Sequence, residues 1–247
     1  MGDEPSPAAP AAPAAPGPDS ALGRLVGVFV SPVRTLGAIA RKPSWLLPLL
    51  LWTSLSFLVG QLVVTRMDLR KTIRDSAAER GQAMTEAQIE QAFEQSQKVS
   101  WIFEAIPVVI PVLLSGIVAG ALWMACQAFG WELKFRQSYG VTIHAFLPSI
   151  VLSVALLAML WNRETIDPQT VGDLLPSHAG VLVSAKTSKV LHSLLSSLDL
   201  MSFWTMGLLV LGLSAATEAP RGRMAGLVFG LWGLYVLGKA GVVSIFS

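Results

Sequence analysis

The sequence is short of charge and of cysteine. Only 14% of its 247 residues are Asp, Glu, Lys or Arg, against roughly 25% in an average soluble domain. Charged side chains are costly in hydrocarbon, so membrane-spanning segments exclude them. Cys126 is the only cysteine, which excludes an intrachain disulfide. It lies in an apolar run, and we interpret it as a small packing residue.

Signatures of catalysis and of nucleic-acid binding are also lacking. The chain contains no complete P-loop, no H-E-x-x-H and no G-x-S-x-G. Its net charge of +2 and the lack of a basic patch with interleaved aromatic residues argue against a nucleic-acid partner. Glu86, Glu90 and Glu94 recur at helical spacing, but no histidine accompanies them, which favours a solvated helix face over a metal site. We therefore predict no enzyme activity, no cofactor and no metal.

What the chain does have is long apolar runs. No Asp, Glu, Lys or Arg occurs in 105–131 or in 137–162, and each run exceeds the ~20 apolar residues that a helix needs to cross a bilayer. The sequence predicts an all-α polytopic membrane protein with five transmembrane helices, at about 44–65, 101–130, 138–162, 200–217 and 224–246. These spans form a membrane domain over 44–247.

The segments outside the spans differ in character. Residues 1–20 alternate alanine and proline and are predicted to be a disordered tail. Residues 21–43 read as short amphipathic helices, which either lie in the membrane interface or pack on the bundle. Residues 66–98 carry a basic stripe, a Thr85–Gln88 capping box and an acidic stripe, so we expect an antiparallel polar hairpin. Residues 163–198 form a second polar connection.

Proline and glycine interrupt the spans in patterns. Pro107, Pro111 and Pro148 remove backbone donors and are predicted to bend their helices. Two strips of small residues allow a close approach between helices, either within the chain or with another molecule. The strips are Gly116 with Gly120, and Gly222 with Gly226 and Gly230.

A few polar residues fall within or beside the spans. His144 is either a proton relay or a hydrogen-bonded structural histidine. Gln61 is placed to hydrogen-bond a neighbouring helix. Asp199 and Lys239 are predicted to lie near the same membrane face, as an ion pair or as near-neighbours, with Lys239 reaching the interface alone as the alternative. Together with the prolines and glycines, these are the candidate site residues.

The cations give a weak indication of orientation. Arg34, Arg41 and Lys42 are interpreted as interfacial cations that face lipid headgroups. The N-terminal side of the membrane carries eight Lys and Arg residues and the other side nine. The short turns on the N-terminal side are basic, which favours a cytoplasmic N-terminus.

Several motifs resemble one known family. FVSPVRT at 29–35 and PSWLLP at 43–48 are similar to the first part of prokaryotic members of the Yip (Ypt/Rab-interacting) polytopic membrane domain family. MTEAQIEQ at 84–91, FRQS at 135–138 and HAFLP at 144–148 are similar to the same group. The resemblance covers about 28–245. It implies five spans, a cytoplasmic N-terminus and the bacterial inner membrane, whereas the Rab-type partner of eukaryotic relatives is not carried over.

Two functions stay open from the sequence. The favoured one is a non-catalytic membrane protein that acts through helix packing and through association with membrane lipid, other membrane proteins or itself. The alternative is a transporter, channel or lipid-handling protein, with a cavity beside the proline-interrupted spans lined by His144, Gln61, Gln127 and Lys239. A water-accessible cavity beside Pro111 and Pro148 would favour the alternative.

Overall fold

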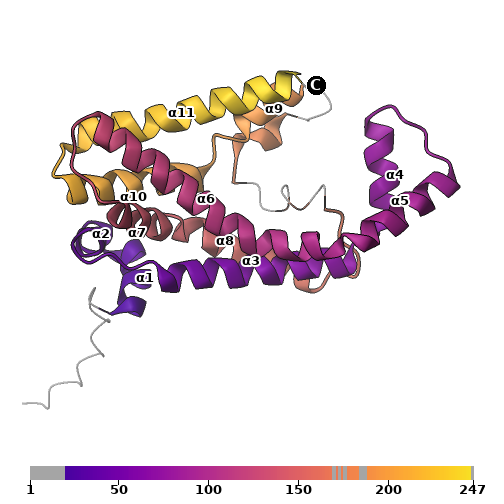
Figure 1. The fold of residues 1–247 in the computed structure, drawn as a ribbon, viewed down its shortest axis with the longest axis horizontal. Helices are drawn as coiled ribbons and strands as arrows, with labels where there is room; N and C mark the ends of the chain where they lie inside the picture. The colour runs from indigo at the N-terminus through magenta and orange to yellow at the C-terminus, as the bar shows by residue number, and fades with distance from the viewer. Residues whose placement is uncertain (1–19, 169–170, 172–173, 175–176, 184–187, 246–247) are drawn as a thin grey trace, which may run out of the picture.

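The computed structural model is helical, as the sequence predicts, and describes residues 20–168, 171, 174, 177–183 and 188–245. Within these residues, five helices are long and apolar enough to cross a membrane (Figure 1). They are α3 (Leu46–Arg66), α6 (Ser100–Ala128), α7 (Phe135–Ala145) continued by α8 (Leu147–Trp161), α10 (Leu200–Thr217) and α11 (Arg221–Ile245). The fold class and the number of long apolar helices are confirmed. The Ala/Pro tail lies outside the described residues.

The third long helix is divided where the chain meets Pro148. α7 ends at Ala145, Phe146 forms a turn, and α8 starts at Leu147 with the proline in its first turn. Pro148 has no amide hydrogen for the carbonyl of His144, four residues earlier, so the helical ladder is interrupted there. α6 instead stays helical through Pro107 and Pro111, and a bend at those two positions stays a prediction.

Two short helices precede the spans and lie across them. α1 (Ala21–Val30) and α2 (Pro32–Arg41) occupy one end of the molecule, where α2 is seen nearly end-on while α3 and α11 run lengthwise (Figure 1). α2 packs against α10, α7 and α1, and its residues 35–40 are all buried. Of the two readings of this segment, packing on the bundle therefore describes α2. α1 keeps one face exposed.

The core lies at the end of the bundle that holds α1 and α2. Leu36 and Ile39 of α2 are fully buried there, with Val141 of α7, Leu213 of α10 and Met224 of α11. Cys126 is buried in the same core, which confirms its packing role. In the most apolar 18-residue stretch of each helix, 6% of the residues of α3 and 11% of those of α11 are buried, against 44% of those of α10. α10 is therefore central, and α3 and α11 turn most of their apolar surface outward, as lipid-facing helices do.

The polar segment after α3 forms two helices, α4 (Leu69–Glu79) and α5 (Glu86–Lys98). Arg70 makes two 2.9 Å hydrogen bonds to the Glu90 carboxylate, and Arg74 donates to Glu86 at 3.0 Å. The order of these pairs makes the helices antiparallel. Thr85 and Gln88 form the predicted capping box at the start of α5.

The predicted basic stripe is Arg66, Arg70 and Arg74, and the acidic one is Glu86, Glu90 and Glu94. Arg66 and Glu94 make no ion pair between α4 and α5 among the described residues. Arg66 donates from Nη1 to the carbonyls of Leu160, Trp161 and Arg163 at the end of α8, which satisfies acceptors that a helix C-terminus leaves open. Glu94 makes no ion pair among the described residues. The hairpin is therefore joined through Glu86 and Glu90.

The described part of the second polar connection includes the 3₁₀ turn η2 (Ala179–Leu182) and the short helix α9 (Lys189–Leu195). α9 packs against α11 and η2. The two arms of the connection meet at an isolated antiparallel bridge between His178 and Asp199.

Candidate functional site

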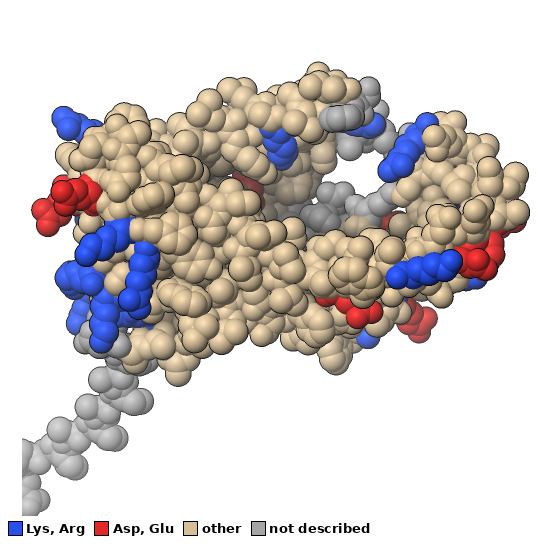
Figure 2. All heavy atoms as spheres, in the orientation of Figure 1, with Lys and Arg blue, Asp and Glu red and all other residues tan. Residues whose placement is uncertain are grey.

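Lys and Arg side chains gather at the end of the molecule that holds α1 and α2 (Figure 2). The turns from α6 to α7 and from α10 to α11 are at this end as well (Figure 1). None of its exposed cations makes an ion pair within 4 Å in the part of the chain that the structure describes. We call this set the cationic end: Arg34, Arg41, Lys42, Lys134, Arg136, Arg221 and Arg223.

The hairpin end differs in how its charges are arranged. Arg70 and Arg74 are paired with glutamates, and Lys71 lies 2.9 Å from Asp75 and 3.8 Å from Asp167. The Arg70 guanidinium also lies 3.7 Å from the centre of the Phe93 ring. The Arg70 hydrogen bond lowers the pKa of the Glu90 carboxyl, and the Glu90 hydrogen bond raises the pKa of Arg70. Much of the positive charge of the hairpin is therefore compensated locally.

Arg24 is the buried member of the cations near α1. Only 5% of it is exposed, and its Nη1 donates at 2.8 Å to the Lys42 carbonyl and to the Ser44 hydroxyl. A buried guanidinium is tolerated when such bonds replace its hydration. These bonds tie α1 to the linker at 42–45, between α2 and α3. Gln137 of α7 donates to the Ala40 carbonyl at 2.9 Å, which holds the end of α2 from the other side.

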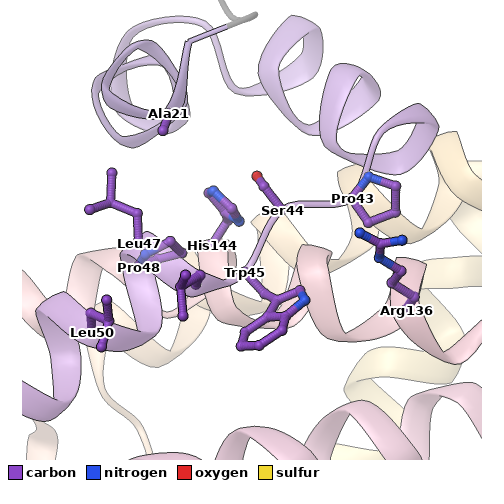
Figure 3. A pocket seen from close by; sticks show the side chains of 10 residues that line it. Ala21, Pro43, Ser44, Trp45, Leu47, Pro48, Leu50, Arg136 and His144 are labelled. Carbon is purple, nitrogen blue, oxygen red and sulfur yellow. The ribbon is translucent and has the colours of Figure 1, made fainter.

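A cavity of about 500 Å³ lies between this linker and α7 (Figure 3). Its apolar wall comes from the first turns of α3, and its polar side from Arg136 and His144 of α7. The ring of Trp45 packs edge-on against Tyr139, with the ring centres 5.9 Å apart. The other lining residues are Ala21, Pro43, Ser44, Leu46, Leu47, Pro48 and Leu50.

His144 is 1% exposed and points toward the cavity (Figure 3). Its Nδ1 lies 2.8 Å from the Gly140 carbonyl. A carbonyl oxygen only accepts, so Nδ1 carries the hydrogen, and Nε2 of the neutral ring is an acceptor. His144 is thus a hydrogen-bonded histidine beside a cavity, and among the described residues no Asp or Glu lines that cavity. A proton relay through it stays a prediction.

The structure does not form the predicted ion pair between Asp199 and Lys239, which is absent among the described residues. Asp199 caps α10, where its Oδ2 accepts from the Ser202 amide at 2.9 Å. Lys239 donates to the Ser197 hydroxyl at 3.0 Å. The Asp199 carboxylate accepts from a free backbone amide in the first turn of α10. Lys239 therefore lies near Asp199, bonded to Ser197, without forming an ion pair with it among the described residues.

The polar residues predicted to line a transport cavity are not brought together. His144 faces the cavity beside the linker, whereas Lys239 is bonded near the start of α10. Gln127 donates to the Leu133 carbonyl at 3.5 Å, and Gln61 is half-buried in α3. Pro111 and Pro148 are both buried and neither lines the cavity beside the linker.

The predicted glycine strips face open space. A methyl group placed on Gly116, Gly120, Gly222, Gly226 or Gly230 would meet no described atom within 4 Å. The strips thus make no close contact with the described part of the chain, and their packing, within the chain or against another molecule, stays a prediction.

Glycines outside any strip make the close contacts instead. Gly60 of α3 lies against Pro107 of α6, and Gly212 of α10 lies against Val141 of α7. A methyl group on Gly140 would lie 3.3 Å from the Pro43 Cβ and from the Ser44 carbonyl. No regular spacing marks these positions, because each depends on which helix happens to cross there.

The comparisons with known proteins identify the family. A sequence model of the Yip1 domain matches residues 26–242, which is most of the chain. The chain therefore belongs to the Yip1 domain family of membrane proteins, which is non-catalytic. No curated protein and no solved structure matches it.

Proposed function

Given that the chain is a Yip1-domain membrane protein, we propose that it organises the membrane by associating with anionic lipids of one leaflet. The observation that carries this proposal is the cationic end, whose seven exposed Lys and Arg residues have no carboxylate partner among the described residues. Each cation close to an anionic leaflet contributes about 1 kcal/mol of attraction. Cations that make no ion pair with a described residue retain that attraction for lipid headgroups.

The exposed face of α1 supports a contact with lipid. Leu22, Val26 and Val30 recur every fourth residue and are 66%, 53% and 75% exposed. The opposite face of the helix is buried against the bundle through Gly23, Arg24, Gly27 and Val28. A helix that lies across the spans with an outward apolar stripe and neighbouring cations is suited to the boundary between headgroups and acyl chains. α1 would then act as a wedge in that leaflet.

The same observation supports an orientation. Lys and Arg are enriched in cytoplasmic loops close to the spans, and the cytoplasmic leaflet is the more anionic one. Both short turns between spans, 129–134 and 218–220, lie at the same end of the molecule as these seven cations. We place this end, and with it the N-terminus, in the cytoplasm. The bacterial inner membrane is the membrane that we propose, on the resemblance to prokaryotic Yip proteins.

The experiment measures lipid preference in the full-length protein. The protein is reconstituted in bilayers of phosphatidylcholine and phosphatidylglycerol, and spin-labelled lipids report which headgroup is enriched at its boundary. The test variant replaces Arg34, Arg41 and Lys42 with glutamine. The matched control removes three exposed cations at the hairpin end, as Arg80→Gln, Lys98→Gln and Arg163→Gln.

We expect the wild type to prefer phosphatidylglycerol. The test variant loses about 1 kcal/mol of attraction for each of three cations, so it should lose most of that preference. The control should retain most of it. Equal losses in the two variants, or no preference in the wild type, would contradict association through the cationic end.

A further inference from the structure

We propose that the cavity beside the linker at 42–45 holds the headgroup of one anionic glycerophospholipid, with Arg136 on its phosphate. This inference rests on the proposed function, and it names a single binding site within the more general attraction of the cationic end. A lipid fits this cavity because the cavity joins an apolar wall to a cationic side.

The size and lining of the cavity fit part of a lipid. Its volume of about 500 Å³ lies within the range of ~300–1,000 Å³ that small-molecule sites occupy. Leu46, Leu47 and Leu50 of α3 offer an apolar surface for the glycerol backbone and the first acyl carbons. α3 exposes most of its apolar surface, so acyl chains would continue along its outside without leaving hydrocarbon.

Arg136 supplies the recognition of phosphate. It lies in the first turn of α7, is exposed, and has no ion-pair partner in the described part of the chain. A guanidinium binds two phosphate oxygens with its planar fork of donors. The positive end of the α7 helix dipole lies at the same turn and adds to the attraction of an anion. Arg24, held at the linker by the Lys42 carbonyl, brings a further positive charge to this region.

His144 adds a preference among headgroups. Nδ1 is occupied by the Gly140 carbonyl, so the remaining ring nitrogen is an acceptor that needs a donor. The glycerol headgroup of phosphatidylglycerol has hydroxyl donors, whereas the trimethylammonium of phosphatidylcholine has none. A site that offers an unpaired acceptor discriminates against a ligand that cannot donate to it. The chemistry therefore favours an anionic lipid with a hydroxyl-bearing headgroup.

Neighbouring contacts hold the site in place. Arg24 fixes the Ser44 hydroxyl at 2.8 Å, and Tyr139 supports the ring of Trp45. Gly140 lets α7 approach the linker at Pro43 and Ser44. Because the walls are positioned by contacts within the protein, the cavity does not need the lipid in order to form, and its loading is measurable on a folded protein.

The test uses native mass spectrometry of the delipidated full-length protein. It is titrated with dioleoylphosphatidylglycerol, with dioleoylphosphatidylcholine and, in a competition arm, with inorganic phosphate. Arg136→Gln removes the proposed phosphate ligand. Ala21→Trp fills the cavity from α1 without changing any charge. Arg223→Gln is the matched control, since Arg223 belongs to the cationic end and does not line the cavity.

We expect one tightly bound phosphatidylglycerol on the wild type. Arg136→Gln and Ala21→Trp should each weaken its binding more than about tenfold, whereas Arg223→Gln should weaken it about fivefold at most. Inorganic phosphate should not displace it.

Each other outcome overturns the site in a different way. Equal weakening by Arg136→Gln and Arg223→Gln would remove the cavity site but leave the proposed function of the cationic end intact. Displacement by inorganic phosphate would show a free-anion site, and equal binding of phosphatidylcholine would show an apolar cavity without headgroup recognition. If no variant and no headgroup changes lipid binding, both this inference and the proposed function fail.

Discussion

Arg24 donates from Nη1 to the Ser44 hydroxyl at 2.8 Å, and this bond joins the first short helix to the start of the first long one. Twenty residues separate the two partners in the chain. The same nitrogen donates to the Lys42 carbonyl, so a single side chain organises the linker that forms one wall of the cavity. The stability of the cationic end should therefore depend on a residue that is itself hidden from lipid.

Replacing Arg24 tests that dependence. Arg24→Met keeps an unbranched apolar stem but removes the guanidinium, which leaves the Lys42 carbonyl and the Ser44 hydroxyl without their donor. We expect the free energy of unfolding to fall by about 2–4 kcal/mol. The measurement is the midpoint of thermal unfolding in detergent, compared with Arg34→Met, whose arginine is exposed and has no ion pair among the described residues. If both variants lower the midpoint equally, the buried bonds contribute nothing specific.

Arg24 also shows which features the sequence could reveal. The five long helices follow from apolar length, which is a local property, so their number and approximate positions were predictable. Arg24 has the same sequence signature as Arg34, a cation in an amphipathic segment, and only the fold decides that one is buried and the other exposed. The cavity was missed for the same reason, since its walls come from residues about 100 positions apart.

The glycine strips show what a local pattern leaves undetermined. The spacing of Gly222, Gly226 and Gly230 describes a smooth helix face, but it does not say what that face meets. In the structure the close helix contacts use Gly60, Gly140 and Gly212, whose neighbours are set by helix crossings. Which glycine is needed for packing is thus a tertiary property.

Gly60 and Gly226 separate these two kinds of glycine. A methyl group on Gly60 would overlap Pro107, whereas one on Gly226 would meet no described atom within 4 Å. We expect Gly60→Ala to destabilise the fold by about 1–3 kcal/mol, because α3 and α6 must separate. Gly226→Ala should be neutral or slightly stabilising, since alanine favours the helix by ~1 kcal/mol.

Thermal unfolding in detergent measures both glycine variants in the same preparation. A stable Gly60→Ala variant would show that α3 and α6 are not in close contact at this point. If Gly226→Ala is less stable than the wild type only at high protein concentration, Gly226 takes part in a contact between copies of the chain.

The α4–α5 hairpin allows a comparison between two glutamates on the same helix. Glu90→Lys replaces the bidentate partner of Arg70 with a like charge, whereas Glu94→Lys changes an exposed residue without an ion pair among those described. We expect faster proteolysis between α4 and α5 in Glu90→Lys, and little change in Glu94→Lys. The charge swap Arg70→Glu with Glu90→Arg should restore resistance, and failure of the swap would mean that the pair does not hold the helices together.

The hairpin should also respond to pH in a definite direction. The Arg70 hydrogen bond holds the pKa of Glu90 below its ordinary value of 4.5. A carboxyl with a depressed pKa stabilises the folded state above its unfolded pKa, and this contribution is lost as pH falls through the folded pKa. Arg70 and Lys71 have raised pKa values, so their contribution to stability is lost only in strongly basic solution. The hairpin should therefore open at acidic pH.

The distance between spin labels on α4 and α5, in a Cys126→Ala background, measures this opening. Wild type should open at acidic pH, and Glu90→Gln, which cannot titrate there, should show a flatter response. Because the pair is exposed, added salt should weaken the effect. An opening that is identical in the two proteins would assign the transition to other carboxylates.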